Sequence, residues 1–174
     1  MRLALVLVAA LALGTSNQAR AEQPPLCPVG TVQFDPLTAA LGYWHLQFEL
    51  TLGDHHSVYA GPHARFGSAL LGDDGDFYSM GMEAAYRYFF SGTAPTGAWV
   101  QARGVAGYLF TRGLPTEEQT FGGYIGALGG YTWILGNRWV LAAGAGLQYI
   151  HMNVAGMGPE GIFPAAHTAV GVAF

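Results

Sequence analysis

The chain has 174 residues, of which 51% are hydrophobic and only 10% are charged, and 26 are glycine. This length suits one domain, but soluble domains usually carry roughly 25% charged residues. The composition therefore argues against an ordinary soluble globular protein. It also excludes intrinsic disorder, which requires low hydrophobicity and high net charge.

The N-terminus has the pattern of a secretory signal peptide. Arg2 precedes an apolar run of 11 residues, Leu3–Leu13, and residues 19–21 (Ala-Arg-Ala) have the small-x-small pattern of a cleavage site. The run is too short for a membrane-spanning helix, which needs about 20 residues. We therefore expect an exported protein that loses residues 1–21.

The expected mature chain is acidic and contains one cysteine. Without Arg2 and Arg20 it has 5 basic and 11 acidic residues, a net charge of −6, and no lysine. This balance provides no basic face for nucleic acid. Cys27 cannot form an internal disulfide, and the preceding Pro25 and Leu26 do not fit a lipidation signal, so a free thiol or an intermolecular partner is expected.

The remaining sequence alternates in polarity in segments of about ten residues. In 42–52 the even positions, including Trp44 and Phe48, are apolar, whereas the odd positions include Gln47 and Glu49. Successive side chains of a strand point to opposite faces, so this segment predicts a strand with one apolar and one polar face. The predicted strands are 29–37, 42–52, 57–67, 79–90, 98–110, 121–134, 139–152 and 165–174.

The connections between these segments alternate in length and set the strand count. The connections at 53–56, 91–97 and 135–138 are short, and those at 67–78, 111–120 and 153–164 are long. Transmembrane barrels have tight periplasmic turns and longer outer loops. The alternation requires a strand before 42–52, and 29–37, with a kink at Pro36, supplies the eighth. Trp99 lies on the polar face of its strand, where we expect a bulge or a position at the rim.

The fold class predicted is an all-β, eight-stranded antiparallel up-and-down barrel of the outer-membrane type. In hydrocarbon an open sheet edge cannot be hydrogen-bonded, so strands span only as closed barrels. A soluble sandwich or lipocalin-like barrel also alternates, but it needs a polar exterior. Here the acidic residues concentrate in the expected loops, which favours the membrane barrel. These residues are Asp73, Asp74, Asp76, Glu117, Glu118 and Glu160.

Five charged residues share the non-aromatic face of the strands, namely Glu49, Arg65, Glu83, Arg87 and Arg103. An eight-stranded barrel has just enough interior for side chains to fill it, so we expect these residues to form a hydrogen-bonded network that plugs the bore. A proton or ion path is the alternative.

Histidines lie on the same face, and a second group lies in a turn. His45, His63 and His167 could bind a metal, but they have no fixed ligand spacing, and we interpret them as core histidines without a metal or cofactor. His55 and His56 are expected to be solvated.

Aromatic residues near strand ends and a terminal Phe174 complete the pattern, with Trp133 and Trp139 flanking one turn. The chain resembles the small outer-membrane barrels of Gram-negative bacteria, the class of OmpX and the OmpA membrane domain. The stretches Gly81–Phe90 and Gly144–Tyr149 are also similar to an uncharacterised barrel family of unassigned activity. The resemblance implies a location in the cell outer membrane and assembly by the barrel-assembly machinery, which would read Phe174.

This reading divides the chain into a signal peptide (1–21), an N-terminal segment (22–28) and a barrel domain (29–174). Outer-membrane lipid and lipopolysaccharide are the expected partners, and we expect a monomer. The acidic Asp73-Asp74-Gly75-Asp76 could hold calcium, but it lacks the spacing of a calcium-binding loop and is read as solvated. The expected role is non-catalytic, in surface structure or in contacts made through acidic loops.

An enzymatic alternative comes from residues 149–156, followed by Glu160. This stretch is similar to the seventh strand of PagL-type lipid A deacylases, which use a His-x-Ser pair and a downstream acid. Acyl transfer of that kind needs a hydroxyl beside the imidazole, but Asn153 occupies the serine position after His151. We therefore interpret His151 as a rim residue, and a narrow pore remains a third possibility.

Overall fold

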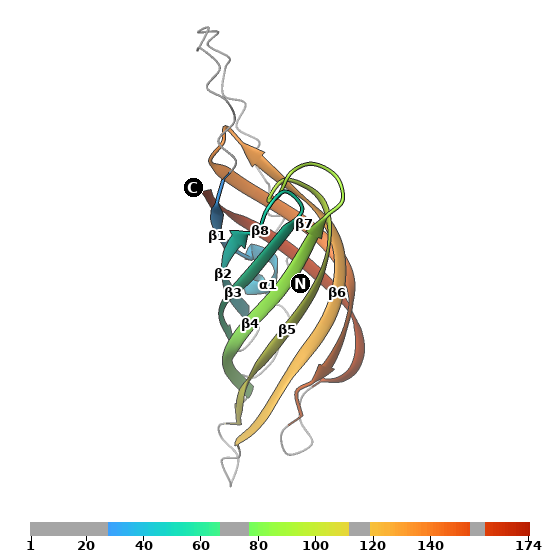
Figure 1. Cartoon of the computed structure of the whole chain (residues 1–174). Helices are drawn as coiled ribbons and strands as arrows, with labels where there is room; N and C mark the ends of the chain where they lie inside the picture. The colour runs from blue at the N-terminus through green and yellow to red at the C-terminus, as the bar shows by residue number, and fades with distance from the viewer. Residues whose placement is uncertain (1–27, 67–76, 112–118, 154–158) are drawn as a thin grey trace, which may run out of the picture.

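The computed structural model describes residues 28–66, 77–111, 119–153 and 159–174, and in these residues the chain forms a closed eight-stranded antiparallel barrel (Figure 1). Each strand pairs with its neighbours in sequence, as the polarity pattern predicts. The strands are β1 (Gly30–Phe34), β2 (Tyr43–Thr51), β3 (His56–Arg65), β4 (Phe77–Phe89), β5 (Gly97–Thr111), β6 (Gln119–Leu135), β7 (Trp139–His151) and β8 (Glu160–Ala173).

The barrel closes where β1 pairs with β8. Thr31 lies opposite Ala173 and Phe34 opposite Val170 in this ladder. The terminal Phe174 extends it, because its backbone N–H donates to the Gly30 carbonyl at 3.0 Å. Closure leaves no unpaired edge along these residues, which is the property that allows a sheet to exist away from water.

The first predicted strand is only partly a strand. The sequence predicts one strand over 29–37, but β1 ends at Phe34 and a short helix, α1 (Pro36–Ala40), follows. Asp35 caps this helix, and Pro36 occupies its first turn, where a missing N–H costs nothing. No helix among the described residues is long and apolar enough to cross a membrane.

The connections lie at two ends of the barrel. Residues 52–55, 90–96 and 136–138 join strands at the end that also carries Phe174, here called the turn end, and α1 and the other strand ends lie towards the opposite end. In the tightest turn Gly136 and Asn137 have φ values of 60° and 56°, the left-handed conformations of the two central residues of a type I′ turn, and the Arg138 N–H donates to the Leu135 carbonyl at 3.2 Å. The connection at 90–96 is as long as that at 112–118, so the predicted alternation of lengths is incomplete. β8 also begins five residues earlier than predicted.

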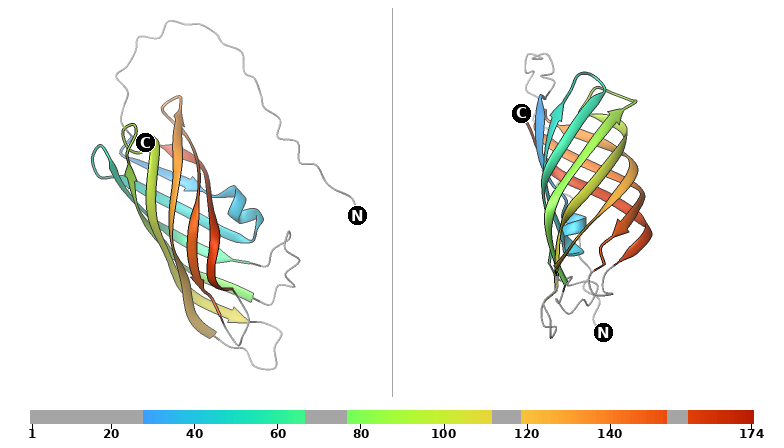
Figure 2. Two further views of the ribbon diagram at one scale, coloured as in Figure 1. Left: turned by 90° about the vertical axis from the view of Figure 1, so that its right-hand side faces the viewer. Right: turned by 60° about the horizontal axis from the view of Figure 1, so that its bottom comes forward.

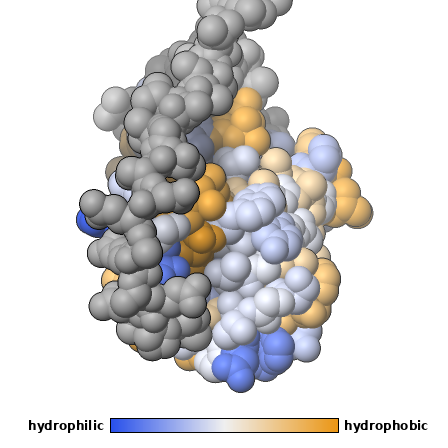
Figure 3. Space-filling model, turned by 90° about the horizontal axis from the view of Figure 1, so that it is seen from above, coloured by the Kyte–Doolittle hydropathy of each residue, from blue (hydrophilic) through white to orange (hydrophobic). Residues whose placement is uncertain are grey.

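The two faces of the sheet have opposite character. In β2 the exposure alternates strictly, so that His45, Gln47 and Glu49 are buried while Leu46 and Phe48 are exposed. The strands are strongly tilted as they wind around the barrel (Figure 2). Seen from the turn end, hydrophobic side chains are visible at the periphery (Figure 3). The interior is thus the polar side of the sheet.

Candidate functional site

The interior of the barrel holds all five charged residues predicted to face inward. Glu49, Arg65, Glu83, Arg87 and Arg103 are each at most 9% exposed. Four of them form two groups. The first, called the Glu49 cluster, consists of Glu49, Thr31, Gln33, Ser57 and Arg87. The second, called the Glu83 cluster, consists of Glu83, His45, Tyr59, His63 and Arg103.

In the Glu49 cluster the carboxylate accepts hydrogen bonds from four side chains. Its Oε2 accepts from Thr31 Oγ1 at 3.2 Å and from Gln33 Nε2 at 2.6 Å. Its Oε1 accepts from Ser57 Oγ at 2.5 Å and from Arg87 Nη1 at 3.0 Å. A buried carboxylate is stable only when it is paired and hydrogen-bonded, and this one, on β2, has donors from three other strands, β1, β3 and β4.

Arg87 connects this cluster to the far wall of the barrel. Its Nε and Nη2 donate to Gln101 Oε1 at 3.0 and 2.8 Å, and Nη2 lies 3.3 Å from His167 Nε2. Since arginine only donates, Nε2 of His167 is the acceptor in this contact. The guanidinium carbon also lies 4.4 Å from the centre of the Trp99 ring, a cation–π contact.

Trp99 lies inside the barrel, and the prediction of a bulge or a rim position is wrong. The register of β5 runs without interruption through Trp99, which is 0% exposed, and its Nε1 donates to Thr132 Oγ1 at 2.9 Å. The indole fits because Gly130 and Gly144 face it. A Cβ at Gly144 would lie only 2.6 Å from Trp99 Cη2. The glycines of β6 and β7 thus make room for one large interior side chain.

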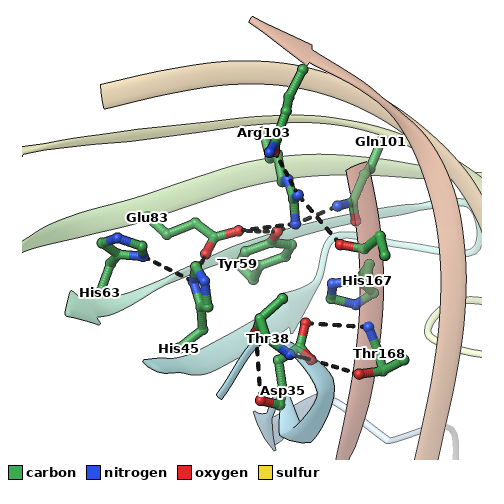
Figure 4. Close-up of polar contacts among 12 residues, drawn as sticks. Asp35, Thr38, His45, Tyr59, His63, Glu83, Gln101, Arg103, His167 and Thr168 are labelled. Carbon is green, nitrogen blue, oxygen red and sulfur yellow. Dashed lines mark hydrogen bonds and ion pairs between the residues drawn. The ribbon is translucent and has the colours of Figure 1, made fainter. Parts of the chain in front are cut away.

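In the Glu83 cluster the carboxylate has fewer donors (Figure 4). Its Oε1 accepts from Tyr59 OH at 2.7 Å and lies 4.0 Å from Arg103 Nη1. Its Oε2 is in close contact with His45 Nδ1, which in turn lies 3.2 Å from His63 Nδ1. Two imidazoles and one carboxylate oxygen therefore converge in the half of the barrel that lies away from the turn end. His167 lies apart from them, beside Arg87.

The remaining cations are held by other contacts. Arg103 Nη2 donates to Gln148 Oε1 at 3.0 Å, and its guanidinium carbon lies 5.4 Å from the Tyr124 ring centre. Arg65 stacks over Tyr43 at 5.1 Å, opposite it in the ladder and well away from Glu49. The two clusters are joined through Gln101, whose Oε1 accepts from Arg87 and whose Nε2 donates to Tyr59 OH at 3.4 Å, so a continuous path of hydrogen bonds runs from Glu49 to Glu83.

Asp35 is a buried acid that the sequence reading missed. Its Oδ1 accepts from the backbone N–H groups of Leu37 and Thr38, both at 3.1 Å, and its carboxylate also accepts from the N–H and hydroxyl of Thr168 on β8 at 3.2 and 2.5 Å. It thereby fastens α1 to β8 at Thr168, beyond the point where the pairing of β1 with β8 ends at Val170. The Asp-Pro pair, an N-cap followed by a first-turn proline, was the available signal.

The rim histidine predicted from the enzymatic resemblance is paired with an acid. His151 Nδ1 lies 3.3 Å from Glu160 Oε1, and the two side chains are 61% and 48% exposed. Glu160 is the first residue of β8 rather than a loop residue. The pair reproduces a base and an acid, while residue 153 supplies an amide in place of a hydroxyl nucleophile.

The turn histidines have partners instead of being only solvated. His56 Nδ1 lies 2.5 Å from Tyr86 OH, and His55 Nδ1 lies 3.0 Å from the Phe89 carbonyl. Both histidines are exposed at the turn end, where their rings also approach Tyr88.

Several predicted features fall outside the described residues. These are the signal peptide, Cys27, and the acidic residues Asp73, Asp74, Asp76, Glu117 and Glu118.

The fold and interior define a class, a closed eight-stranded antiparallel barrel with an apolar exterior and a hydrogen-bonded polar core. Residues 5–159 match a family described as "Protein of unknown function (DUF3575)", and the chain belongs to this family. The match includes β1 to β7 and ends just before β8. No curated protein and no solved structure matches the chain.

Proposed function

We propose that the protein is an integral barrel of the Gram-negative outer membrane with a filled interior and a non-catalytic role in envelope structure or surface contacts. The observation that carries this proposal is the separation of apolar and ionised side chains between the two faces. The outward positions of β5 from Ala98 to Phe110 include no charged residue. This stretch is longer than the 9–11 residues with which a tilted strand spans a bilayer.

Exposed aromatic residues at both ends of this apolar band support the proposal. Near the turn end they are Tyr88, Phe90, Trp133 and Trp139, and near the other end they are Trp44, Tyr108 and Phe121. Aromatic girdles of this kind lie at the two water interfaces of membrane barrels.

A soluble barrel is disfavoured by the same surface. On β2 alone, Trp44, Phe48 and Leu50 are 49%, 50% and 53% exposed. Large contiguous apolar patches are rare on soluble monomers, since they promote association. Lipid tails would cover these side chains without that cost.

The filled interior supports a structural role. Trp99, Arg87, Phe89, Leu109 and His167 are among the large side chains that are fully buried, and the bore of an eight-stranded barrel is just wide enough for such a core. We propose that contacts with lipopolysaccharide or other partners are made by the outer loops.

The membrane proposal is tested by fractionating cells and comparing boiled with unboiled samples on an SDS gel. We expect the protein in the outer-membrane fraction with heat-dependent mobility. A soluble periplasmic protein without a mobility shift contradicts the proposal. A matched pair of variants sharpens the test: Ala102→Arg in the apolar band should cost about 2–4 kcal/mol of stability in vesicles, while Ser91→Arg in a turn should have little effect.

Two further measurements address the alternatives. Planar-bilayer recordings should show no single-channel steps, and regular steps would support a narrow pore. The His151–Glu160 pair at 3.3 Å is the one observation that favours a lipid A deacylase. Mass spectra of lipid A from cells with and without the protein should be identical. An altered acyl pattern that His151→Ala abolishes would establish the enzyme instead.

A further inference from the structure

The Glu83 cluster contains a set of metal-ligating groups that the proposed structural role does not use. We propose that His45, His63 and Glu83 form a binding site for a divalent first-row transition metal ion such as Zn²⁺. Two imidazoles and one carboxylate are the protein ligands of a common class of zinc and non-haem metal sites, which leave further positions for water.

The ligand atoms are close enough for one ion to bridge them. One nitrogen or oxygen from each residue lies within 4.8 Å of the others. With metal–ligand bonds of about 2.0–2.2 Å, tetrahedral ligand atoms stand about 3.3–3.6 Å apart. The Nδ1 atoms of His45 and His63, at 3.2 Å, are just below that spacing. Binding therefore requires Glu83 Oε2 and His45 to move apart by a small side-chain rotation.

Hydrogen bonding alone leaves this arrangement incompletely satisfied. Glu83 Oε2 and His63 Nδ1 both approach His45 Nδ1, and a neutral imidazole has only one N–H to share between two such neighbours. His63 is 2% exposed, and within the described residues its Nε2 has no hydrogen-bond partner. A metal ion would bind all three Lewis-basic atoms at once, whereas one proton can satisfy them only in part.

The surroundings of Glu83 orient it as a ligand. Tyr59 OH donates to Oε1 at 2.7 Å and itself receives a hydrogen bond from Gln101 Nε2 at 3.4 Å. Oε1 is thus occupied, and Oε2 is the oxygen directed at the two histidines. Such outer partners fix ligand orientation in metal sites and contribute substantially to affinity.

A cavity beside the cluster provides space for the additional ligands. It has a volume of about 190 Å³, lies beneath α1, and is lined by His45, Tyr43 and Gln148 among others. A water molecule takes about 30 Å³ in the liquid, so several fit. Of the three ligands, His45 lines this cavity, and no residue of the Glu49 cluster does.

The donor set also selects the class of ion. Two nitrogen ligands disfavour Ca²⁺ and Mg²⁺, which prefer oxygen, and suit Zn²⁺, Co²⁺ or Ni²⁺. Arg103, with Nη1 4.0 Å from Glu83 Oε1, opposes the charge of the ion, so Glu83 is the essential compensating ligand.

The test is Zn²⁺ titration of the full-length protein, folded in detergent and carrying no polyhistidine tag, by isothermal calorimetry. We expect one saturable site for Zn²⁺ and none of comparable affinity for Ca²⁺. His63→Gln should weaken binding more than about 10-fold, at least the loss seen for outer-shell changes in metal sites. The control variants His56→Gln and His151→Gln, in exposed histidines, should bind like the wild type. Absence of saturable binding to the folded wild type, or unchanged binding by His63→Gln, overturns the proposal.

X-ray absorption of the Zn²⁺-loaded protein keeps the test decisive if His63→Gln does not fold. The triple variant His55→Gln/His56→Gln/His151→Gln removes the three exposed histidines and leaves the interior ones in place. It should retain a zinc shell containing two imidazole nitrogens and one carboxylate oxygen. Loss of the imidazole signal in this variant would place the ion at the surface and refute the interior site.

Discussion

The two buried carboxylates of the barrel differ in how completely they are hydrogen-bonded. Glu49 has two donors on each oxygen, including the guanidinium of Arg87 at 3.0 Å. Glu83 has Tyr59 on one oxygen and a histidine on the other, with Arg103 no closer than 4.0 Å. Both are 1% exposed. Equal burial therefore does not mean an equal role. All the hydrogen-bond positions used on Glu49 are filled by donors of the protein, whereas Glu83 has fewer donors and can still bind a further ligand.

The largest effect is expected for Glu49→Gln. The amide NH₂ would face two donors whichever way it turns, so Arg87 would lose its anion and a donor clash would follow. Breaking a buried pair typically costs about 3–5 kcal/mol. Urea unfolding of the protein in vesicles measures this loss. A cost below about 1 kcal/mol would show that the Glu49 cluster contributes little to the stability of the barrel.

Glu83→Gln is the matched variant and should cost less, about 1.5–3 kcal/mol, because fewer charge-assisted hydrogen bonds are lost. The amide can still accept from Tyr59 and present its NH₂ to His45. The same unfolding experiment checks the order of the two variants. A larger loss for Glu83→Gln than for Glu49→Gln would reverse the comparison.

Asp35→Ala tests how much the cap of α1 and its contact with β8 contribute to the stability of that part of the barrel. It removes the helix N-cap, which is worth about 0.5–2 kcal/mol, together with the contact to Thr168. Hydrogen exchange should accelerate in α1 and in the adjoining part of β8 while β2 and β3 near the Glu49 cluster stay protected. Asp35→Asn, which keeps a capping oxygen, is the control and should change exchange less.

His63→Gln should have the smallest effect on stability, about 0.5 kcal/mol, since His63 offers only one hydrogen bond at Nδ1. The same variant is expected to have the greatest effect on Zn²⁺ binding. Thermal unfolding without added metal measures the first quantity. A destabilisation as large as that of Glu49→Gln would mean that the Glu83 cluster contributes as much to the stability of the barrel as the Glu49 cluster does.

Much of the fold could be predicted from the sequence, because a polarity that alternates from residue to residue over about ten residues fits few structures other than a strand with one apolar and one polar face. The phase of β2 and the inward placement of Glu49, Glu83, Arg87 and Arg103 follow from period two alone. Trp99 was misplaced because a large aromatic residue was assumed to belong to the lipid side. Its interior position depends on Gly130 and Gly144, which lie far from it in sequence.

The alternating pattern does not show which interior residues belong to the same cluster. Alternation assigns His45, His63 and His167 to one face but does not give their heights in the barrel, which depend on strand stagger. The register places His45 opposite His63, while His167 lies opposite Gly144 near Trp99. Asp35 was missed because Val32 and Phe34 favoured continuing the strand, although the following proline marked a helix start.

The central claim, that the apolar face meets lipid and the polar face is enclosed, is tested most directly by tryptophan quenching in vesicles. Single-tryptophan variants would keep either Trp44 or Trp133, which are 49% and 45% exposed, or Trp99, which is 0% exposed. Brominated lipids should quench Trp44 and Trp133 and leave Trp99 nearly unaffected, and aqueous iodide should quench none of them strongly. Strong iodide quenching of Trp44 and Trp133 without quenching by brominated lipid would contradict the account.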